Sequence, residues 1–164
     1  MNSKIYGYNE QLIPQTGVNP NYKMKFGICI NGRKESDKPE EIETTVVKDA
    51  ESMGLSIDGK IEEWDAMDQD GWGRKLMTAK SISASMGGKR NYGDPGNDYV
   101  ASKAYAIGQD CNSWFSIIFP NGDQLIIPCV INVTSLGGDA TGVESLEWEI
   151  KSDGKPTYVE YVAV

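Results

Sequence analysis

The chain lacks histidine entirely, since none of its 164 residues is one. Histidine is the commonest general base in enzymes, it activates the nucleophile in Ser-His and Cys-His pairs, and most zinc sites use it as a ligand. Its absence removes these routes to catalysis and to a bound metal. We therefore expect a protein that is not an enzyme and that needs no metal or cofactor.

Cysteines and long apolar runs are also scarce. The cysteines Cys29, Cys111 and Cys129 are odd in number, share no metal-ligand spacing and lie in apolar stretches, so we predict buried thiols without disulfides. No run of 18 apolar residues is present, and residues 1–8 lack the apolar stretch of a signal peptide. We expect a protein that has no contact with membranes and is made and kept in a cytoplasm.

Basic residues are too few for a protein that clamps nucleic acid. There are 16 of them against 24 acidic residues, which gives a net charge of −8. A like-charged wall repels phosphates, however, so DNA could slide past this protein without sticking. Residues 74–106 hold six basic and two acidic residues, whereas residues 42–73 hold two and nine, and residues 107–164 two and eight. These segments could be complementary faces for copies of the chain, or simply a solvated surface.

Two fragments imitate ligand-binding motifs but lack their essential residues. Residues 68–71 (DQDG) resemble the middle of a calcium loop, yet the first ligand position holds Ala66 and the bidentate glutamate position holds Met77. Residues 87–90 (GGKR) resemble a phosphate loop, yet its hydroxyl position is occupied by Arg90. Neither fragment predicts a ligand.

The hydrophobic pattern predicts a single domain preceded by an arm. Residues 1–22 are polar and rich in Gly, Asn and Pro, so we predict an extended N-terminal arm. Residues 23–164 form one β-rich domain, in which residues 23–30 alternate as a strand and residues 31–41 are charged, as in an exposed loop.

Turn dipeptides divide the middle of the chain into strands. Asp58-Gly59 between apolar runs predicts a hairpin with a two-residue turn, because Asp-Gly accepts the positive φ angles of a type I′ turn. Residues 76–86 predict a strand that Gly87-Gly88 ends. Asn121-Gly122 predicts a second hairpin between strands at 113–119 and 124–134, the latter with Leu125, Ile127, Cys129, Ile131 and Val133 on one face.

A helix and two further strands complete the predicted fold. Asp94 can cap a helix, Pro95 suits its first position and Gly108 suits its end, so we predict a helix at about 95–107. Leu146, Trp148 and Ile150 alternate with polar, mostly acidic residues, and a last strand follows at 157–162. The predicted fold is mainly β: a β-sandwich or open barrel with one flanking α-helix.

The four tryptophans divide into two pairs. Trp114 and Trp148 lie in strand patterns and are predicted to be buried in the core. Trp64 and Trp72 lie beside acidic residues and glycines, where they could anchor an interface. The alternative is a set that lines one groove and stacks on sugars or bases.

The order of short motifs in this chain resembles that of bacteriophage tail tube proteins, the major tail proteins of long-tailed phages. The likeness extends over residues 45–160, with Ala79 where the family often has glycine. It is carried by residues 56–64 (SIDGKIEEW), 67–68 (MD), 71–72 (GW), 78–81 (TAKS), 88–90 (GKR), 93–98 (GDPGND) and 147–156 (EWEIKSDGKP).

The resemblance implies a structural role. Six copies would form a ring, and rings would stack into a hollow, negatively charged tube around a tape measure protein, with tail terminator and tail-tip or initiator proteins at its ends. DNA would pass through without specific binding, and the tube would be assembled in the host cytoplasm as the virion tail. The candidate assembly residues are Trp64, Trp72, Arg33, Lys34, Lys89 and Arg90, and the lumen candidates are Glu147 and Glu149.

Two other functions remain open at this point: a stand-alone β-sandwich module that binds a ligand or carbohydrate, and the tube subunit of a contractile phage-like particle. A further hypothesis is that the 31–41 loop and the N-terminal arm bridge stacked rings. Deletion of residues 33–39 would then stop polymerisation and leave the monomer folded.

Overall fold

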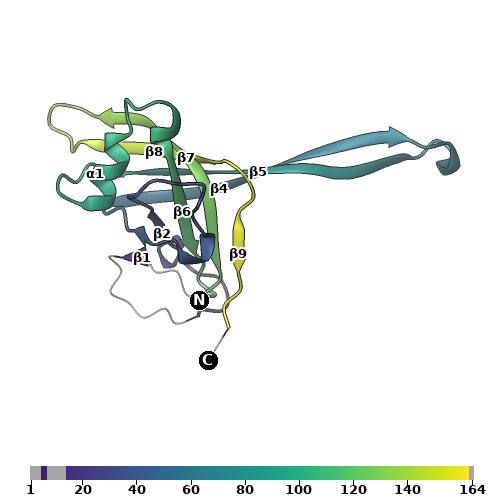
Figure 1. Ribbon diagram of the computed structural model, residues 1–164, viewed down its shortest axis with the longest axis horizontal. Coiled ribbons are helices and arrows are strands. Elements are labelled where there is room, and N and C mark those ends of the chain that lie inside the picture. The colour runs from purple at the N-terminus through teal and green to yellow at the C-terminus, as the bar shows by residue number, and fades with distance from the viewer. Residues whose placement is uncertain (1–4, 7–13, 163–164) are drawn as a thin grey trace.

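The computed structural model describes residues 5–6 and 14–162, so most of the predicted N-terminal arm, residues 1–4 and 7–13, lies outside the described residues. Figure 1 shows a β-rich body from which two long strands project far to one side. The strands are β1 (Ile5–Tyr6), β2 (Lys25–Ile28), β3 (Thr44–Thr45), β4 (Ala50–Asp65), β5 (Gly73–Lys89), β6 (Asn112–Ile118), β7 (Gln124–Gly137), β8 (Ser145–Ser152) and β9 (Thr157–Val159). The helical elements are α1 (Pro95–Ser102) and the short 3-10 helices η1 (Asn21–Lys23), η2 (Pro39–Glu41), η3 (Met67–Gln69) and η4 (Gly108–Cys111).

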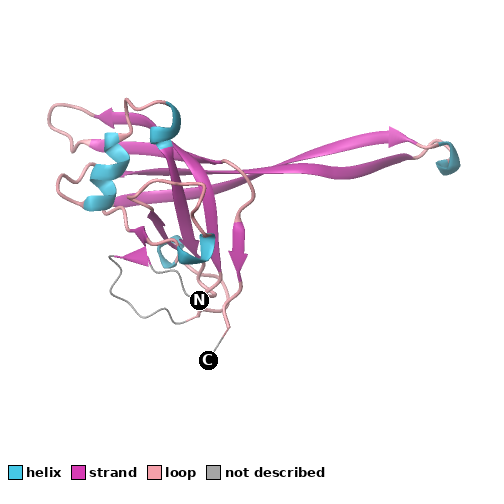
Figure 2. Cartoon of the chain, in the orientation of Figure 1, coloured by secondary structure: helices cyan, strands magenta, loops and turns pink. Residues whose placement is uncertain are grey.

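The strands form one sheet in the order β1-β3-β2-β6-β7-β8-β5-β4, and β9 pairs with the start of β7. Neighbours are antiparallel except β1 and β3, which are parallel. Within the described ranges the two ends of the sheet do not pair, so the sheet is open. α1 flanks the sheet on one side (Figure 2). The predicted mainly β fold with one flanking helix is therefore confirmed, in its open form.

The main core lies against one face of this sheet, and strict alternation along β7 and β8 supplies much of it. Phe115 of β6 is fully buried and meets Trp148 edge to face, with ring centres 6.2 Å apart. Trp114 is buried in a second, smaller cluster with Cys29 and Ile42. Alternating buried residues of β7 and β8 are Leu125, Ile127, Cys129, Ile131, Leu146, Trp148 and Ile150. The faces predicted for both strands and the burial of both tryptophans are thus confirmed.

The predicted hairpin at Asn121-Gly122 is also confirmed. It joins β6 to β7, and Gly122 has the positive φ of 94° that only glycine adopts easily. The Phe119 amide donates to the carbonyl of Asp123 at 2.8 Å, which closes the turn. A Cβ on Gly122 would lie 2.7 Å from the ring of Tyr161, so packing also requires glycine here.

The hairpin predicted at Asp58-Gly59 is wrong. β4 runs through both residues, which pair with Ser81 and Lys80 of β5, and neither residue has a positive φ. The turn lies further on, where Asp70 (φ 49°) and Gly71 (φ 86°) reverse the chain. Gly59 serves a different purpose, because a Cβ there would lie 2.7 Å from the sulfur of Met77.

The helix begins as predicted and ends early. Asp94 caps it by accepting from the Asn97 amide at 3.0 Å, and Val100 is fully buried. The helix stops at Ser102, five residues before the predicted end, and Ile107 is 86% exposed. The apolar spacing beyond Val100 therefore misled the prediction, since Ile107 does not face the core. No helix among the described residues is long and apolar enough to cross a membrane.

Two strand ends also differ from the prediction. β5 does not end at Gly87-Gly88 but continues to Lys89, because both glycines pair with β8. Gly88 is required there, since a Cβ would lie 2.2 Å from the carbonyl oxygen of Asp49, whose chain crosses over β5. β9 ends at Val159, three residues early, because its partner β7 begins at Gln124 and offers no further ladder.

Candidate assembly surfaces

Residues 57–82, called the arm below, pair as strands only with one another among the described residues. Pairing of β5 with β8 starts at Ser83, so beyond that point β4 and β5 form a two-stranded ribbon (Figure 1). At about 3.3 Å per residue, the nine residues from Ile57 to Asp65 span roughly 30 Å. A two-stranded hairpin alone is at best marginally stable in water. The arm therefore needs support from outside its own chain.

One face of the arm continues the core face of the sheet. From the body outward, the paired side chains on this face are Met53 with Met86, Leu55 with Ala84, Ile57 with Ile82 and, past a β-bulge, Ile61 with Met77. Ala84 and Met86 are buried in the core, whereas Ile57 is 60% exposed and Ile61 53%. We call Ile57, Ile61, Met77 and Ile82 the apolar stripe. It is the end of a hydrophobic layer that its own subunit does not cover.

The tip of the arm combines exposed apolar side chains with negative charge. Met67 and Trp72 are almost fully or largely exposed, and Trp64 is half-exposed, with the Arg74 guanidinium 5.7 Å from its ring centre. Residues 62–70 hold five acidic residues and no basic one. The structure thus places Trp64 and Trp72 together on the arm, and their role as interface anchors stays a prediction.

The opposite face of β4, β5, β8 and β7 carries small and polar side chains, and we call it the polar face. The register aligns its residues in rows across the four strands. One row is Ser52, Gly87, Glu147 and Ser135; the next is Gly54, Ser85, Glu149 and Asn132. Ser81, Ser83 and Ser85 alternate with apolar residues along β5, so the sequence held a signal for this face that our sequence analysis missed.

Both lumen candidates lie on the polar face. Glu147 is exposed, and Glu149 accepts a hydrogen bond from the Asn132 amide at 2.9 Å. Their neighbours within each row are serine, glycine and asparagine, so the two carboxylates are the longest side chains in these rows and the only charges. The candidates are brought together by one strand, and whether they line a conduit stays a prediction.

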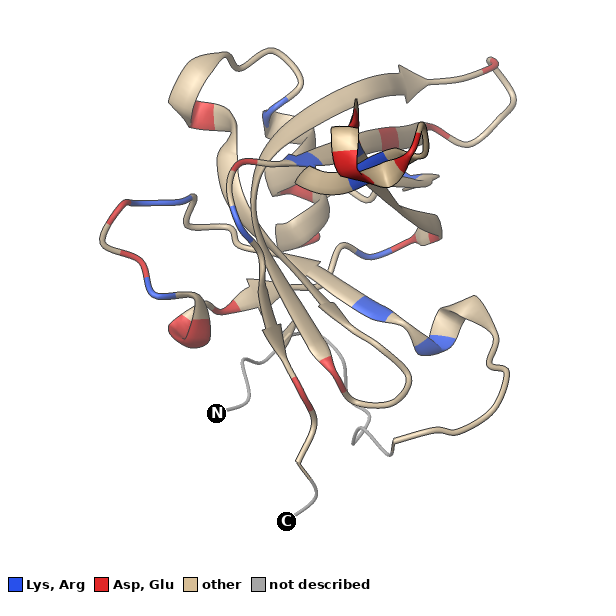
Figure 3. Cartoon of the chain, turned by 90° about the vertical axis from the view of Figure 1, so that its right-hand side faces the viewer, with Lys and Arg blue, Asp and Glu red and all other residues tan. Residues whose placement is uncertain are grey.

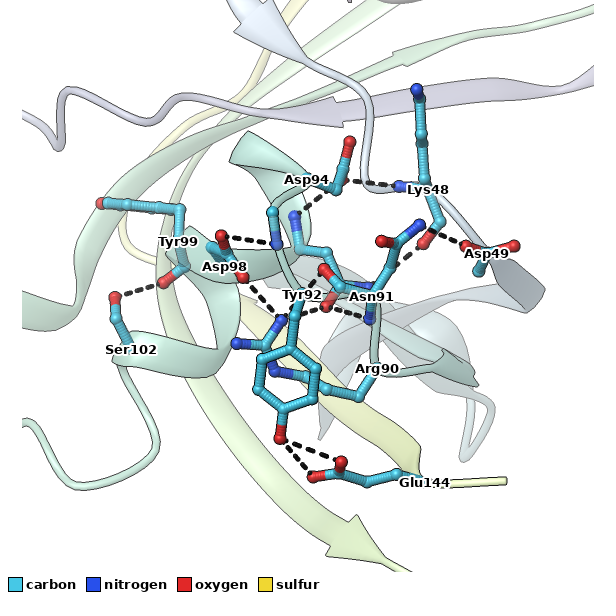
Figure 4. Close-up of polar contacts among 12 residues, drawn as sticks. Lys48, Asp49, Arg90, Asn91, Tyr92, Asp94, Asp98, Tyr99, Ser102 and Glu144 are labelled. Atoms are coloured by element: carbon cyan, nitrogen blue, oxygen red, sulfur yellow. Dashed lines mark hydrogen bonds and ion pairs between the residues drawn. The ribbon is translucent and has the colours of Figure 1, made fainter. Parts of the chain in front are cut away.

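Arg90, a candidate assembly residue, is bound within its own subunit (Figure 4). It donates to Asp98 at 2.7 Å and to the side-chain oxygen of Asn97 at 2.9 Å, and its side chain is only 12% exposed. Its guanidinium also lies 4.1 Å from the ring centre of Tyr92. The Tyr92 hydroxyl donates to Glu144, which raises the pKa of Tyr92. Arg90 thus holds α1 against the end of β5.

Asn97 is the buried centre of this network and was not singled out in the sequence. Its side-chain oxygen accepts from Arg90 and from the Asn91 amide, at 2.9 and 3.0 Å. Its side-chain nitrogen donates to the carbonyls of Lys48 and Lys89, at 3.2 and 2.9 Å. All four hydrogen-bonding positions of the amide are therefore used. They join α1, the end of β5 and the segment that enters β4.

The remaining basic candidates differ in their availability. Lys89 is 43% exposed and lies 3.3 Å from Glu51. Arg33 is only 17% exposed and donates to Asp153 at 2.6 Å. Lys34 has an exposed side chain. Of these three, Arg33 is the one most engaged within the subunit, and the part of all three in assembly stays a prediction.

The 31–41 loop is attached to the body as well as exposed. Asp37 accepts from the Lys34 amide at 2.8 Å and from the indole nitrogen of Trp114 at 3.1 Å. Deletion of residues 33–39 would therefore also remove contacts inside the subunit. A substitution such as Lys34→Glu tests the loop's part in assembly without this complication.

The chemistry available to this surface is limited. Over residues 5–6 and 14–162 there is no group of three or more His, Cys, Asp or Glu that could hold a metal ion. Cys29, Cys111 and Cys129 are all buried and unpaired, and burial raises the pKa of Cys129 to about 12. Its thiol stays protonated at neutral pH and is a poor nucleophile.

Comparison with known proteins identifies the fold. A chain in the tail of an empty gene transfer agent particle, determined with helical refinement in C6 symmetry, superimposes with a TM-score of 0.66 at 17% identity. A chain in the virion of the native gene transfer agent particle gives a TM-score of 0.64, also at 17% identity. Each match covers 87% of this chain and the whole of the other. This chain has the fold of a gene transfer agent tail protein. No family model matches the sequence, and no curated protein does.

Proposed function

We propose that this chain is the structural, non-enzymatic subunit of a phage-like tail tube. The observation that carries the proposal is the arm, whose apolar stripe extends the core layer beyond the body and requires a neighbouring molecule to cover it. The shared fold with a chain of a particle tail supports the same conclusion.

Self-assembly follows from two features of the sheet. β4 is the last strand of the sheet order and leaves one edge unpaired among the described strands, and such an edge is a template for another chain. The arm and the surface that covers it differ, so the contact is heterologous, and heterologous contacts generate closed rings or open filaments. We propose hexameric rings that stack into a hollow tube.

The polar face is the proposed lining of the conduit. It offers hydroxyl groups, glycines and the carboxylates of Glu147 and Glu149 to a DNA molecule, and the net charge of −8 keeps phosphates from binding strongly. DNA would then pass without specific recognition. The apolar stripe lies on the opposite face of the same strands, so one sheet separates the conduit from the contacts between subunits.

The proposed partners follow from the same role. A tube of defined length requires a tape measure protein within it, an initiator at the tail tip and a terminator at the far end. Its location would be the virion tail, after assembly in the host cytoplasm.

Negative-stain electron microscopy of the purified protein over a concentration series tests this function. We expect hollow tubes or six-fold rings, either spontaneously or after addition of a tail-tip initiator complex. Particles that stay monomeric under both conditions would contradict the proposal and favour a stand-alone binding module.

A further inference from the structure

An open groove of about 400 Å³ lies between the η1–β2 segment and the chain that enters β4. Its apolar wall includes Met24, Phe26, Val47 and Met53, all of which belong to the main core cluster or pack on its rim. Lys25 and Lys48 also line it. The side chain of Asn21 reaches across to the carbonyl of Met53 at 3.3 Å. The groove therefore opens onto the core, beside the strand that forms the unpaired edge of the sheet.

We infer that this groove receives the arm of a second copy of the chain. The inference rests on the proposed function and adds the acceptor for the arm. The arm cannot reach its own groove, because β4 and β5 carry it straight away from the body for roughly 30 Å (Figure 1). Its apolar stripe needs an apolar surface, and the groove is an opening through which the core layer of another copy is exposed.

The charges of the two surfaces are complementary. The outer half of the arm, residues 62–70, holds five acidic residues and no basic one, and Figure 3 shows acidic colour at the tip that points towards the viewer. The chain beside the groove is basic, since residues 14–34 hold Lys23, Lys25, Arg33 and Lys34 and no acidic residue. Electrostatic complementarity of this kind favours one docking orientation over its reverse. Asp49 and Glu51 on the β4 side of the groove would in turn face the basic inner half of the arm, which carries Arg74, Lys75 and Lys80.

A pair of one-sided variants tests the docking. In the first, Asn-Gly replaces residues 59–80, which shortens the arm to a two-residue hairpin turn and keeps the groove. In the second, Lys23→Glu and Lys48→Glu reverse the charge beside the groove and keep the arm. Circular dichroism verifies that both fold, and light scattering coupled to gel filtration measures their mass.

We expect neither variant to form tubes alone, and the second to need about tenfold or more protein than the unmodified chain before any assembly appears. Mixed together, they should form a 1:1 complex that does not grow, because only one arm and one groove match. Lys23→Arg with Lys48→Arg is the matched control that retains the charge and should assemble normally.

Charge exchange gives a second reading. Adding Asp65→Lys and Asp68→Lys to the groove variant restores opposite charges across the contact, and assembly should return. The inference is overturned if the groove variant assembles like the unmodified chain, if the shortened arm still permits tubes, or if the mixture stays monomeric. Failure of the unmodified chain to assemble under any condition would instead refute the proposed function itself.

Discussion

At the scale of single residues, Asn97 is the position on which the most contacts depend. Its buried amide makes four hydrogen bonds that join α1, β5 and the segment before β4. We predict that Asn97→Ala lowers the free energy of unfolding by about 3 kcal/mol, because it strands buried carbonyl and amide groups without partners. Urea denaturation measures the loss. Asn132→Ala, which removes one exposed hydrogen bond, should change stability by less than about 1 kcal/mol.

Cys129 makes the stability depend on pH. Desolvation by burial raises its pKa to about 12, from an ordinary value of 9.0 that the unfolded chain regains. The thiol's contribution is therefore complete below pH 9 and is lost as the pH rises towards 12, because only the unfolded chain releases the proton in that range. We predict that the unfolding free energy of the unmodified protein falls more steeply above pH 9 than that of Cys129→Ala, by about 1.4 kcal/mol per pH unit. Equal slopes would contradict the burial of this thiol.

At the scale of elements, the arm should be the least protected part of the free subunit. It has two strands and no cover, whereas β6 and β7 are buried between neighbours. Hydrogen exchange by mass spectrometry should show rapid exchange in peptides from residues 57–82 and slow exchange in residues 112–131. After assembly the arm should become protected. An arm that is equally slow in the monomer would mean that its own hairpin is stable without a neighbour.

The two turn dipeptides show how far the sequence can predict these elements. Asn121-Gly122 and Asp58-Gly59 have nearly the same local signal, yet only the first forms a turn. Strands β6 and β7 around the first bury side chains on both partners, so tertiary packing agrees with the dipeptide. Around the second, the nearest body contacts end at Ser83, and the ladder between β4 and β5 continues instead. No local signal reports where a ladder stops, so the arm could not be predicted.

At the scale of the whole molecule, the polar face should tolerate charge reversal in assembly and fail in function. Glu147→Lys with Glu149→Lys changes two exposed or half-buried side chains that do not face the core. We predict tubes of normal shape that now retain DNA, most strongly at low salt. Filter binding of labelled duplex DNA over a salt series measures this. Glu160→Lys with Asp139→Lys makes the same change of charge away from the polar face and should leave DNA retention near that of unmodified tubes.

Surfaces of the molecule were harder to predict than its core, for a physical reason. Burial leaves a period in the sequence, so the faces of β7 and β8 and the burial of Trp114 and Trp148 could be predicted from alternation. The polar face is assembled from four strands whose register only folding determines, and Glu147 and Glu149 were identified from one of those strands alone. Arg33 and Arg90 carry the charge typical of an interface, but the acids that bind them are 120 and 8 residues away in the chain.

The unbroken course of β4 and β5 from body to tip also has a mechanical consequence. A pull on the tip is directed along the strands, and β5 is bonded to β8 over the seven paired residues from Ser83 to Lys89. These bonds lie across the direction of pull, so they share the load and must break together. A subunit joined to others through its arm would resist stretching far better than one joined through a flexible loop, and a tube of such subunits could bend and recoil without losing its wall.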